Sequence, residues 1–473
     1  MHELRIPQAE EIIKKTRELI AEQEASNFNK RSTGINLQTF LRVFTISVCF
    51  MAKVTLEGLA IKCQELQYGL KITKQALQKR LQAGKKELQA LLSTATLFAM
   101  SQTVETPGVA RAMEQFAAIL ITDATTISLP DKLAAFHKGL GGTNSKSAMK
   151  IQATYDVKSK AYRKISQRSS ARENDAAYME ELITQIKANE LSITDLGYYG
   201  VGHFKKISEK GAYFISKIKS NTVLYSENDK LINLVRELRG KSFIDKAVSI
   251  KGDAGKTVMQ VRLCGIKLPS TVYSERIRKA NKKAKSTGKT LSKVERERLK
   301  WILMITNISQ NMLDCRDVCE LYRIRWQIEL IFKSWKSHFA IDKMNNIGKD
   351  YWDCLLYGKL IVITLLTALH SHFNNWFMQQ EVRGISFLRF MKNMRDNLDK
   401  LMDFFTFRIP IEQLVLVLNR ILHTSRLEKR RRKTSEQVLS DFNLPYDCLH
   451  LIEDFHVSSA DFDTETPSLD VAA

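Results

Sequence analysis

Cysteines are few in this sequence, and none of them is paired at short spacing. The 473 residues include seven cysteines, an odd number, and no Cys-X-X-Cys pair occurs. This pattern argues against a disulfide framework and against a zinc site, and it favours a reducing compartment. Cys315 and Cys319 are one helical turn apart but lack matching Cys or His neighbours in the sequence. We expect both to be inert, half-buried side chains.

Long hydrophobic runs are also missing. The longest one, LIVITLLTAL at residues 360–369, lies between Lys359 and His370. It is much shorter than the roughly 20 apolar residues that a membrane-spanning helix needs, and no secretory leader is recognisable. We therefore expect this run to be a buried helix of a soluble domain.

Acidic residues are too few to balance the basic ones. The chain has 73 Lys and Arg against 51 Asp and Glu, a formal net charge of +22. Such an excess favours a nucleic acid as partner, because contacts from Lys and Arg to phosphates release counterions. An anionic lipid surface is the alternative, but no other feature supports it. A glycine-rich phosphate loop is also absent, which disfavours a nucleotide-driven phosphotransferase.

The chain is too long for one ordinary core and predicts roughly two to four domains. No internal repeat occurs, but the character of the sequence changes along its length. Residues 1–112 have helical periodicity, residues 113–343 are of α/β type, and residues 344–445 are again helical. The last stretch, 446–473, is acidic and rich in small residues, and we expect it to be disordered.

The first helical region contains the rhythm of a helix-turn-helix at residues 55–81. An apolar-periodic helix is followed by Gly69, and Thr73 is a good N-cap for a second helix. The exposed side of this second helix can reach base edges and phosphates in a major groove. Its five polar residues are Lys74, Gln75, Gln78, Lys79 and Arg80. The alternative is an ordinary helical hairpin with a solvated basic face; the basic net charge favours DNA contact.

Two acids stand out in the α/β region. A β-rich run covers residues 117–130, two strands follow at 150–170, and a helix at 176–186 leads to a short strand at 191–200. Asp123 interrupts the first strand, where an unpaired carboxylate among buried neighbours is costly. Asp195 follows the last one, where an Asp is ordinarily a cap. Together they can converge on one edge of a sheet.

A third acid lies in YRIRWQIELIFKSWK at residues 322–336. At about 100° per residue, Tyr322, Arg325, Glu329 and Lys336 share a narrow helical stripe. The simplest interpretation is a solvated face on which a Glu329–Lys333 pair contributes a few tenths of a kcal/mol. If this helix packs beside the two aspartates, however, three carboxylates meet and require cations. Two divalent ions about 4 Å apart would meet that need and activate a water or hydroxyl for attack on a phosphodiester.

These residues resemble a known signature. The spacing Y-(2)-R-(3)-E-(6)-K is similar to the YREK motif of DDE transposases of the IS-four type. TDATT around Asp123 resembles the first-aspartate motif of that family, and DLGYYG from Asp195 resembles the second. Leu196 stands where many members have Arg, which leaves the role of that neighbour open. The resemblance covers residues 117–336.

The resemblance implies an α/β, ribonuclease H-like catalytic domain at 113–343 with a β-rich insertion at about 221–300. Helical regions flank it, the N-terminal one binding DNA. The metal ligands implied are Asp123, Asp195 and Glu329, holding two Mg²⁺ ions, with Mn²⁺ as a substitute. Mg²⁺ suits ligand sets made of oxygen alone.

The resemblance also implies DNA-binding roles. Tyr322, Arg325 and Lys336 would hold phosphates near the scissile bond, and Lys333 would pair with Glu329 or with DNA. Trp301 occupies the place of an aromatic that stacks on a flipped base; a buried strand Trp is the alternative. The basic run at 275–300 is either a solvated arm or a clamp on DNA.

The implied activity is cut-and-paste transposition of an insertion sequence. Strands would be cleaved at terminal inverted repeats, and the exposed 3′-hydroxyl would attack the opposite strand or target DNA. The implied partners are double-stranded DNA and a second copy of the chain, in a bacterial cytoplasm and on the nucleoid when DNA is bound. A DNA-binding regulator without catalysis and a nuclease that cuts without joining are the alternatives.

Overall fold

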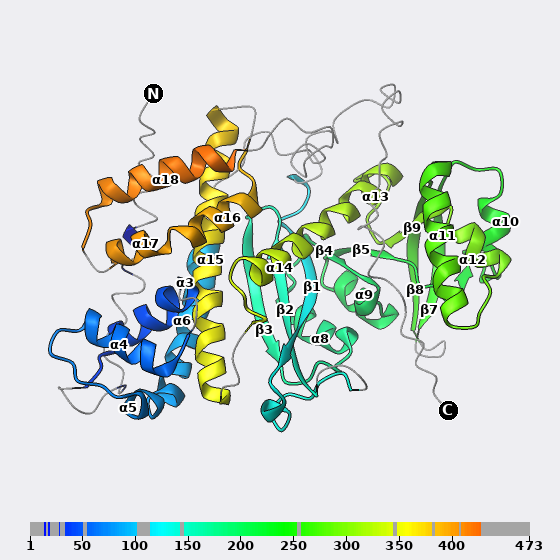
Figure 1. Ribbon diagram of the computed structural model, residues 1–473. Coiled ribbons are helices and arrows are strands. Elements are labelled where there is room, and N and C mark those ends of the chain that lie inside the picture. Colours follow the sequence, from blue (N-terminus) through cyan, green and yellow to red (C-terminus); the bar gives the residue numbers. More distant parts are fainter. Residues whose placement is uncertain are drawn as a thin grey trace. The chain divides into compact units, whose positions relative to one another are not determined.

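The computed structural model describes residues 14–15, 18, 28, 34–50, 54–101, 114–141, 146–252, 257–343, 348–380, 384–405 and 408–426. The chain forms two compact units (Figure 1). Unit 1 comprises Met1–Pro107, Ala124–Glu173 and Glu329–Lys429, and unit 2 comprises Gly108–Asp123, Asn174–Ile328 and Arg430–Ala473. The tail expected at 446–473 lies outside the described residues.

Nine described strands pair in the order β3-β2-β1-β4-β5-β9-β8-β7-β6. Their bounds are β1 (Ala118–Leu129), β2 (Ser147–Asp156), β3 (Ala161–Arg168), β4 (Glu190–Thr194), β5 (Tyr213–Lys217), β6 (Leu224–Tyr225), β7 (Phe243–Gly252), β8 (Thr257–Lys267) and β9 (Trp301–Thr306). β4 is parallel to both β1 and β5, whereas β2 with β3 and all pairs from β5 to β6 are antiparallel. The α/β class with mixed pairing is thereby confirmed.

Unit 2 is built on the parallel strands β4 and β5 and the antiparallel strands beyond them. Its helical segments are α8 (Asp175–Gln185), η3 (Leu196–Tyr198), α9 (Val201–Glu209), α10 (Leu234–Leu238), α11 (Ser270–Ser286), α12 (Lys293–Arg298), α13 (Cys315–Arg323) and η5 (Ile324–Trp326). α9 connects β4 to β5, as a parallel pair requires. Its Phe204 stacks on Phe214 of β5 with ring centroids 4.3 Å apart, which anchors the crossover in the core.

The basic run at residues 275–300 is largely helical. α11 contains most of it, and α12 follows with a capping box in which Ser292 and Glu295 satisfy each other's backbone N–H groups. Three of its lysines, Lys282, Lys283 and Lys285, are exposed on α11. The strands expected between 221 and 300 are β6, β7 and β8, so only the first part of this stretch is rich in strand.

Unit 1 combines β2, β3 and the second half of β1 with helices from both ends of the chain. Its helical segments are α2 (Leu37–Arg42), η1 (Val43–Ser47), α3 (Val48–Phe50), α4 (Leu56–Leu66), α5 (Lys74–Gln78), α6 (Leu81–Ser101), η2 (Asp131–Leu133), α15 (Lys349–Gln380), α16 (Phe387–Asp396), α17 (Leu398–Phe405) and α18 (Ile411–Ser425). A further helix, α14 (Gln327–Ser337), enters this unit at Glu329.

α15 is the central helix of unit 1 and contains the long apolar run of the sequence. Its segment Lys349–Phe377 is long and apolar enough to cross a membrane, but 94% of the apolar window is buried inside the protein. The expectation of a buried helix at 360–369 is therefore confirmed. A Cβ at Gly358 would overlap the carbonyl oxygen of Phe44, so the glycine allows η1 to contact the backbone of α15.

The helix-turn-helix rhythm of unit 1 is present in the structure. α4 ends at Leu66, Gly69 has a φ of +73°, and Thr73 accepts a hydrogen bond from the N–H of Ala76 at 3.2 Å. This φ favours glycine, because other side chains are strained there. The second helix, α5, spans only five residues before α6 begins at Leu81.

Candidate active site

Two aspartates of unit 2 occupy the same level of neighbouring strands. Residues 118–122 of β1 pair in register with residues 190–194 of parallel β4. Asp123 directly follows the first of these stretches, and Asp195 directly follows the second. Neighbouring strands lie about 4.8 Å apart. The structure therefore brings these two carboxylates together.

The two aspartates are held differently. β1 continues past Asp123 to Leu129, so this carboxylate projects from the middle of a strand. β4 ends at Thr194, and Asp195 accepts a hydrogen bond from the N–H of Gly197 at 2.8 Å, which starts the 3₁₀ turn η3. This bond uses Oδ1 of Asp195 and fixes the orientation of the carboxylate.

Asp123 forms an ion pair with a residue of the YREK motif. Nη1 of Arg325 lies 3.2 Å from Oδ2 of Asp123, with the two side chains only 6% and 18% exposed. A partly buried carboxylate needs such a partner, because its charge is poorly solvated. Sequence reasoning assigned Arg325 to phosphate and did not foresee this pair.

A further carboxylate, Asp175, borders the same place. It is the first residue of α8, and a methyl group at Gly197 would lie 3.0 Å from Oδ1 of Asp195 and 3.1 Å from Oδ2 of Asp175. Both oxygens thus approach the same point of the backbone. Sequence reasoning missed Asp175, because an acid in the first turn of a helix is ordinarily explained by the helix dipole.

The hydroxyl of Tyr198 faces this acidic group. Tyr198 is fully buried, and its hydroxyl has no hydrogen-bond partner among the described residues. Burial raises the pKa of Tyr198 well above its usual value, and the charges of Asp123, Asp175 and Asp195 raise it further. The tyrosine therefore stays neutral and can donate a hydrogen bond into the site.

The YREK segment is helical throughout but is not one regular α-helix, so its side chains do not all follow the rotation of 100° per residue that the sequence analysis assumes. Tyr322 ends α13, Arg325 lies in the 3₁₀ turn η5, and Glu329 is in α14. A 3₁₀ turn rotates about 120° per residue instead of 100°, and hydrophobic spacing did not indicate this change. The motif residues are consequently presented by three consecutive segments.

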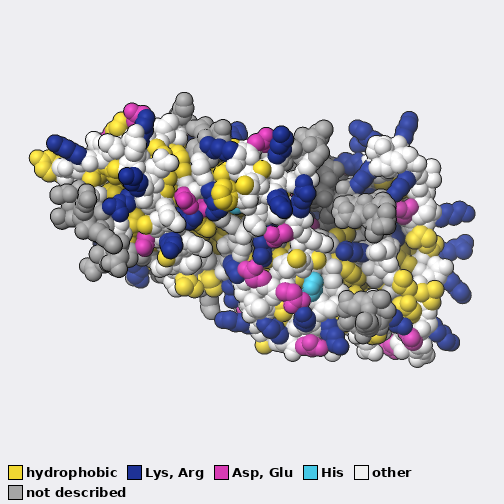
Figure 2. All heavy atoms as spheres, turned by 90° about the horizontal axis from the view of Figure 1, so that it is seen from below, with side chains coloured by type: hydrophobic (Ala, Val, Ile, Leu, Met, Phe, Trp, Pro, Cys, Tyr) yellow, Lys and Arg dark blue, Asp and Glu magenta, His cyan; other side chains and the backbone are white. Residues whose placement is uncertain are grey.

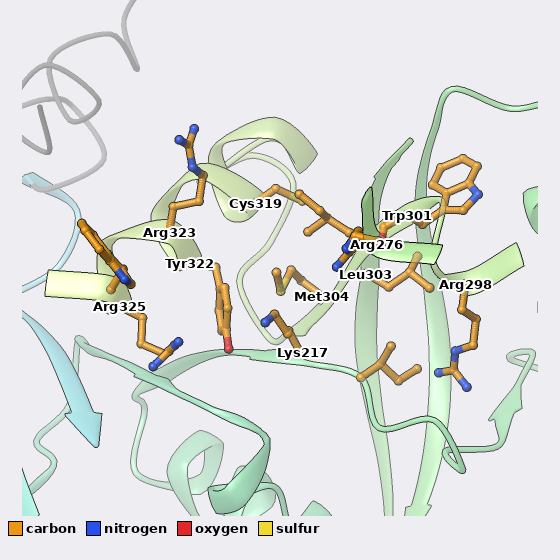
Figure 3. A pocket seen from close by; sticks show the side chains of 13 residues that line it. Lys217, Arg276, Arg298, Trp301, Leu303, Met304, Cys319, Tyr322, Arg323 and Arg325 are labelled. Carbon is orange, nitrogen blue, oxygen red and sulfur yellow. The ribbon is translucent and has the colours of Figure 1, made fainter. Parts of the chain in front are cut away.

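Tyr322 lies between two cations of unit 2. Lys217 Nζ lies 5.2 Å and Arg325 Cζ 5.9 Å from the centre of its ring, and the tyrosine is only 5% exposed. Figure 3 shows Tyr322 with Lys217 on one side of it and Arg325 on the other. Cations favour the face of an aromatic ring, so Tyr322 helps to position both.

These residues line a basic cavity of about 160 Å³ in unit 2 (Figure 3). Its cationic residues are Lys217, Arg276, Arg298, Arg323 and Arg325, and its aromatic ones are Trp301, Tyr322 and Trp326. Arg276 donates to the carbonyl of Trp301 at 3.0 Å, and Arg298 donates to that of Lys219 at 2.8 Å. Trp301 begins β9 and is 2% exposed, which places it in the strand core as well as at the cavity wall.

The other motif residues belong to unit 1. Glu329 and Lys336 are half-buried on α14, and Lys333 is exposed. Nε1 of Trp335 donates to the hydroxyl of Tyr162 on β3 at 3.1 Å, which fixes α14 to the strand within this unit. Asp123 is the last residue of its segment in unit 2, and Glu329 is the first of its segment in unit 1.

The polar residues expected on the second helix of the helix-turn-helix fall into two groups, and the last two of them follow the end of α5. Lys74, Gln75, Gln78 and Lys79 are exposed. Arg80 is half-buried and donates to the carbonyl of Phe28 at 3.3 Å. Four of the five residues therefore have the exposure that DNA contact needs, while Arg80 also supports the fold.

Comparisons with known proteins identify the family of this chain. A family model described as "Transposase DDE domain" matches residues 114–365. The chain belongs to the family of DDE transposases. It is therefore an enzyme of DNA transposition, and the resemblance seen in its motifs is confirmed.

Individual relatives agree with the family. A transposase for the insertion sequence element IS1151 of Clostridium perfringens is 27% identical over 80% of this chain and 82% of its own length. A transposase for IS231F of Bacillus thuringiensis subsp. israelensis is 28% identical over 60% of this transposase and 63% of its own length. Among solved structures, a piggyBac transposase synaptic complex with hairpin DNA has a TM-score of 0.41 and 11% identity, covering 92% of this chain and 86% of that one.

Proposed function

We propose that this transposase moves an insertion sequence by cut-and-paste transposition. Strands would be cleaved at terminal inverted repeats, and the freed 3′-hydroxyl would be joined to target DNA. The observation that carries the proposal is the register of Asp123 and Asp195 on adjacent parallel strands of a DDE-family chain. The strand order β3-β2-β1-β4-β5 supports a ribonuclease H-like core at 113–343, between an N-terminal DNA-binding region and a C-terminal helical one.

The metal ligands in this proposal are Asp123, Asp195 and Glu329. The donors are all carboxylate oxygens, the ligand type that Mg²⁺ prefers and that also accepts Mn²⁺. Bound metal would activate the attacking water or hydroxyl and stabilise the leaving oxygen. The proposal is supported for two of these ligands, because Asp123 and Asp195 follow directly on the paired residues of parallel strands in unit 2.

Arg325 has two roles in this proposal. In the free protein its guanidinium neutralises Asp123 at 3.2 Å. When DNA and metal are bound, the metal ions would neutralise Asp123 in place of Arg325. The guanidinium would then bind a phosphate bidentately. Tyr322, Lys333 and Lys336 would hold the backbone beside it.

The remaining DNA contacts extend along unit 2 and the helix-turn-helix. Figure 2 shows Lys and Arg side chains projecting over the end of the molecule that contains α11 and α12, where Lys282, Lys283 and Lys285 are exposed. We assign this surface to the DNA backbone, and the exposed face of α5 to the inverted repeat. Trp301 and Arg298 line the same cavity, so a base extruded from the duplex would meet an aromatic ring and a cation there.

A complete reaction joins two ends, so we propose that a homodimer synapses two inverted repeats. The reaction would take place in the bacterial cytoplasm, on the nucleoid. The membership in the DDE family and the exposed lysines of α11 support these proposals.

The test is cleavage and joining of end DNA by the purified full chain with Mg²⁺ or Mn²⁺. Asp123→Asn, Asp195→Asn and Glu329→Gln should each retain end binding and lose cleavage by about three orders of magnitude or more. Undiminished cleavage by any of them would overturn the metal-ligand assignment. Cleavage without joining would identify a nuclease, and binding without cleavage by the native chain would identify a regulator.

A further inference from the structure

Three cysteines that are far apart in the sequence meet in the core of unit 2. Cys264 is on β8, and Cys315 and Cys319 are one turn apart on α13. The sulfur atoms of Cys264 and Cys315 and a carboxylate oxygen of Asp245 all lie within 4.8 Å of one another. Cys315 and Cys319 are buried and not half-buried as expected, and β8 supplies the matching cysteine that their neighbours in the sequence do not.

The cluster is a closed, buried place. Cys264 is fully buried, and Cys315 and Cys319 are 8% and 3% exposed. Asp245 on β7 is directly opposite Cys264 on β8, so both side chains leave the same face of the sheet. None of the six described cysteines forms a disulfide.

The carboxylate of Asp245 is held in one orientation by an arginine. The guanidinium of Arg262 donates to both carboxylate oxygens of Asp245, with Nε 2.6 Å from Oδ1. It also donates to the carbonyl of Leu313 at 2.6 Å. A carboxylate held in this way keeps one orientation toward the sulfur atoms, as the outer partners of metal ligands do.

The thiol of Cys315 is fixed against the sheet. It donates to the carbonyl of Ile244 on β7 at 3.2 Å and approaches the carbonyl of Gly265 on β8 at 3.6 Å. The sulfur atom of Cys315 is thereby held beside Cys264 and Asp245.

We propose that Cys264, Cys315 and Cys319, together with Asp245, bind a structural Zn²⁺ ion that fastens α13 to β8. Thiolates select Zn²⁺ over Mg²⁺ and Mn²⁺, and a buried set of three sulfurs and one oxygen is a tetrahedral site without an open position. On binding, the thiol protons are released to water. The site is chemically separate from the oxygen-only donors of the active site.

This ion would fix the start of the YREK segment. Cys319 is followed after three residues by Tyr322, and α13 runs directly into the turn that contains Arg325. Fastening α13 to the sheet would therefore hold Tyr322 and Arg325 in place. The inference does not depend on the proposed reaction, because metal content is measured without DNA.

The experiment is metal analysis of the full chain after expression with zinc and removal of loosely bound metal. We expect one zinc per chain, lost in Cys264→Ser, Cys315→Ser and Cys319→Ser, and retained in Cys63→Ser. Cys63 is a matched control, because it is equally buried but lies on α4 in unit 1. Exchange with Co²⁺ should give the visible bands of a tetrahedral thiolate site in the native chain and in Cys63→Ser.

A second measurement covers variants that fold poorly. A zinc chelator should lower the melting temperature of the native chain and of Cys63→Ser by several degrees, and should leave a folded Cys264→Ser unchanged. The proposal is overturned if the folded native chain contains no zinc and gives no cobalt spectrum. It is equally overturned if zinc persists in the Cys264→Ser variant, or if intact mass shows a disulfide among these cysteines.

Discussion

Nη1 of Arg325 lies 3.2 Å from Oδ2 of Asp123, and both side chains are largely withdrawn from solvent. The proposed phosphate-binding cation is thus paired with a proposed metal ligand. Such a pair fixes the orientation of the carboxylate. It also means that metal and Arg325 compete for Asp123 in the free protein.

This competition makes a prediction for Arg325→Ala. The variant should bind Mg²⁺ at least as tightly as the native chain, because the competing cation is gone. It should nevertheless cleave end DNA about 30-fold more slowly, since losing a charge-assisted hydrogen bond to phosphate costs roughly 2 kcal/mol. Single-turnover cleavage across a Mg²⁺ titration measures both effects. Arg325→Lys should recover only part of the rate, and a Lys variant as fast as the native chain would contradict bidentate phosphate binding.

Asp175 is predicted to support metal binding without being essential. Asp175→Asn removes one negative charge beside Asp195 and Tyr198, so the Mg²⁺ concentration for half-maximal cleavage should rise about tenfold, while the maximal rate falls less than in Asp195→Asn. Glu209→Gln is the control, because Glu209 is exposed at the end of α9 in the same unit. An unchanged Mg²⁺ dependence in Asp175→Asn would show that Asp175 does not support metal binding and only stabilises the start of α8.

The contrast between Asp195 and Asp175 shows which residues of this site could be predicted from the sequence. Asp123 and Asp195 were found because each interrupts or ends a strand pattern, and the parallel register of β1 and β4 then aligns them. Asp175 starts a helix, where an acid is expected for local reasons, and only the packing of α8 near Gly197 gives it another meaning. Spacing alone could not reveal this neighbour.

The YREK segment and the cysteines show a second limit of prediction from the sequence. Apolar spacing predicted a helix at 322–336 correctly in its second half, but the 3₁₀ turn at Ile324–Trp326 leaves the hydrophobic pattern nearly unchanged. Cys264 joins Cys315 only because β8 and α13 pack together, which no short-range motif encodes. Local periodicity therefore predicted the elements, whereas contacts between distant elements had to come from the structure.

The exposed face of α5 leads to a prediction about salt dependence. A Lys74→Ala and Lys79→Ala double variant should bind inverted-repeat DNA more weakly, and the slope of log affinity against log salt should decrease by about 2, since two phosphate contacts are lost. Lys62→Ala is a suitable control, because Lys62 on α4 pairs with Glu65 at 2.6 Å. An unchanged slope in the double variant would show that this helical hairpin has only a solvated face.

Arg80 should behave differently from its neighbours. It is half-buried and donates to the carbonyl of Phe28, so Arg80→Ala should lower the free energy of unfolding by about 1 kcal/mol. Denaturant unfolding measures this loss, and Lys79→Ala serves as the exposed reference. Equal stability of the two variants would contradict a structural role for Arg80.

The hydrogen bond between Trp335 and Tyr162 predicts how unit 1 positions Glu329. The Tyr162 hydroxyl is fully buried and accepts from Trp335 at 3.1 Å and from Thr367 at 3.4 Å, and burial raises the pKa of Tyr162 to about 12. Tyr162→Phe leaves the buried Nε1–H of Trp335 unpaired, whereas Thr367 keeps its bond to the carbonyl of Ile363 at 2.7 Å. The free energy of unfolding should therefore fall by roughly 1–3 kcal/mol. Because α14 carries Glu329, cleavage should slow while end binding stays unchanged.

A double-mutant cycle separates this anchor from a general loss of stability. Tyr162→Phe and Trp335→Phe each remove the same bond, so their combined effect on cleavage should be smaller than the sum of the single effects, with a coupling of at least about 0.5 kcal/mol. Leu418→Ala is the control, because Leu418 is equally buried in unit 1 but lies on α18, away from the bond. If Leu418→Ala slows cleavage as much at equal loss of stability, the bond does not position Glu329.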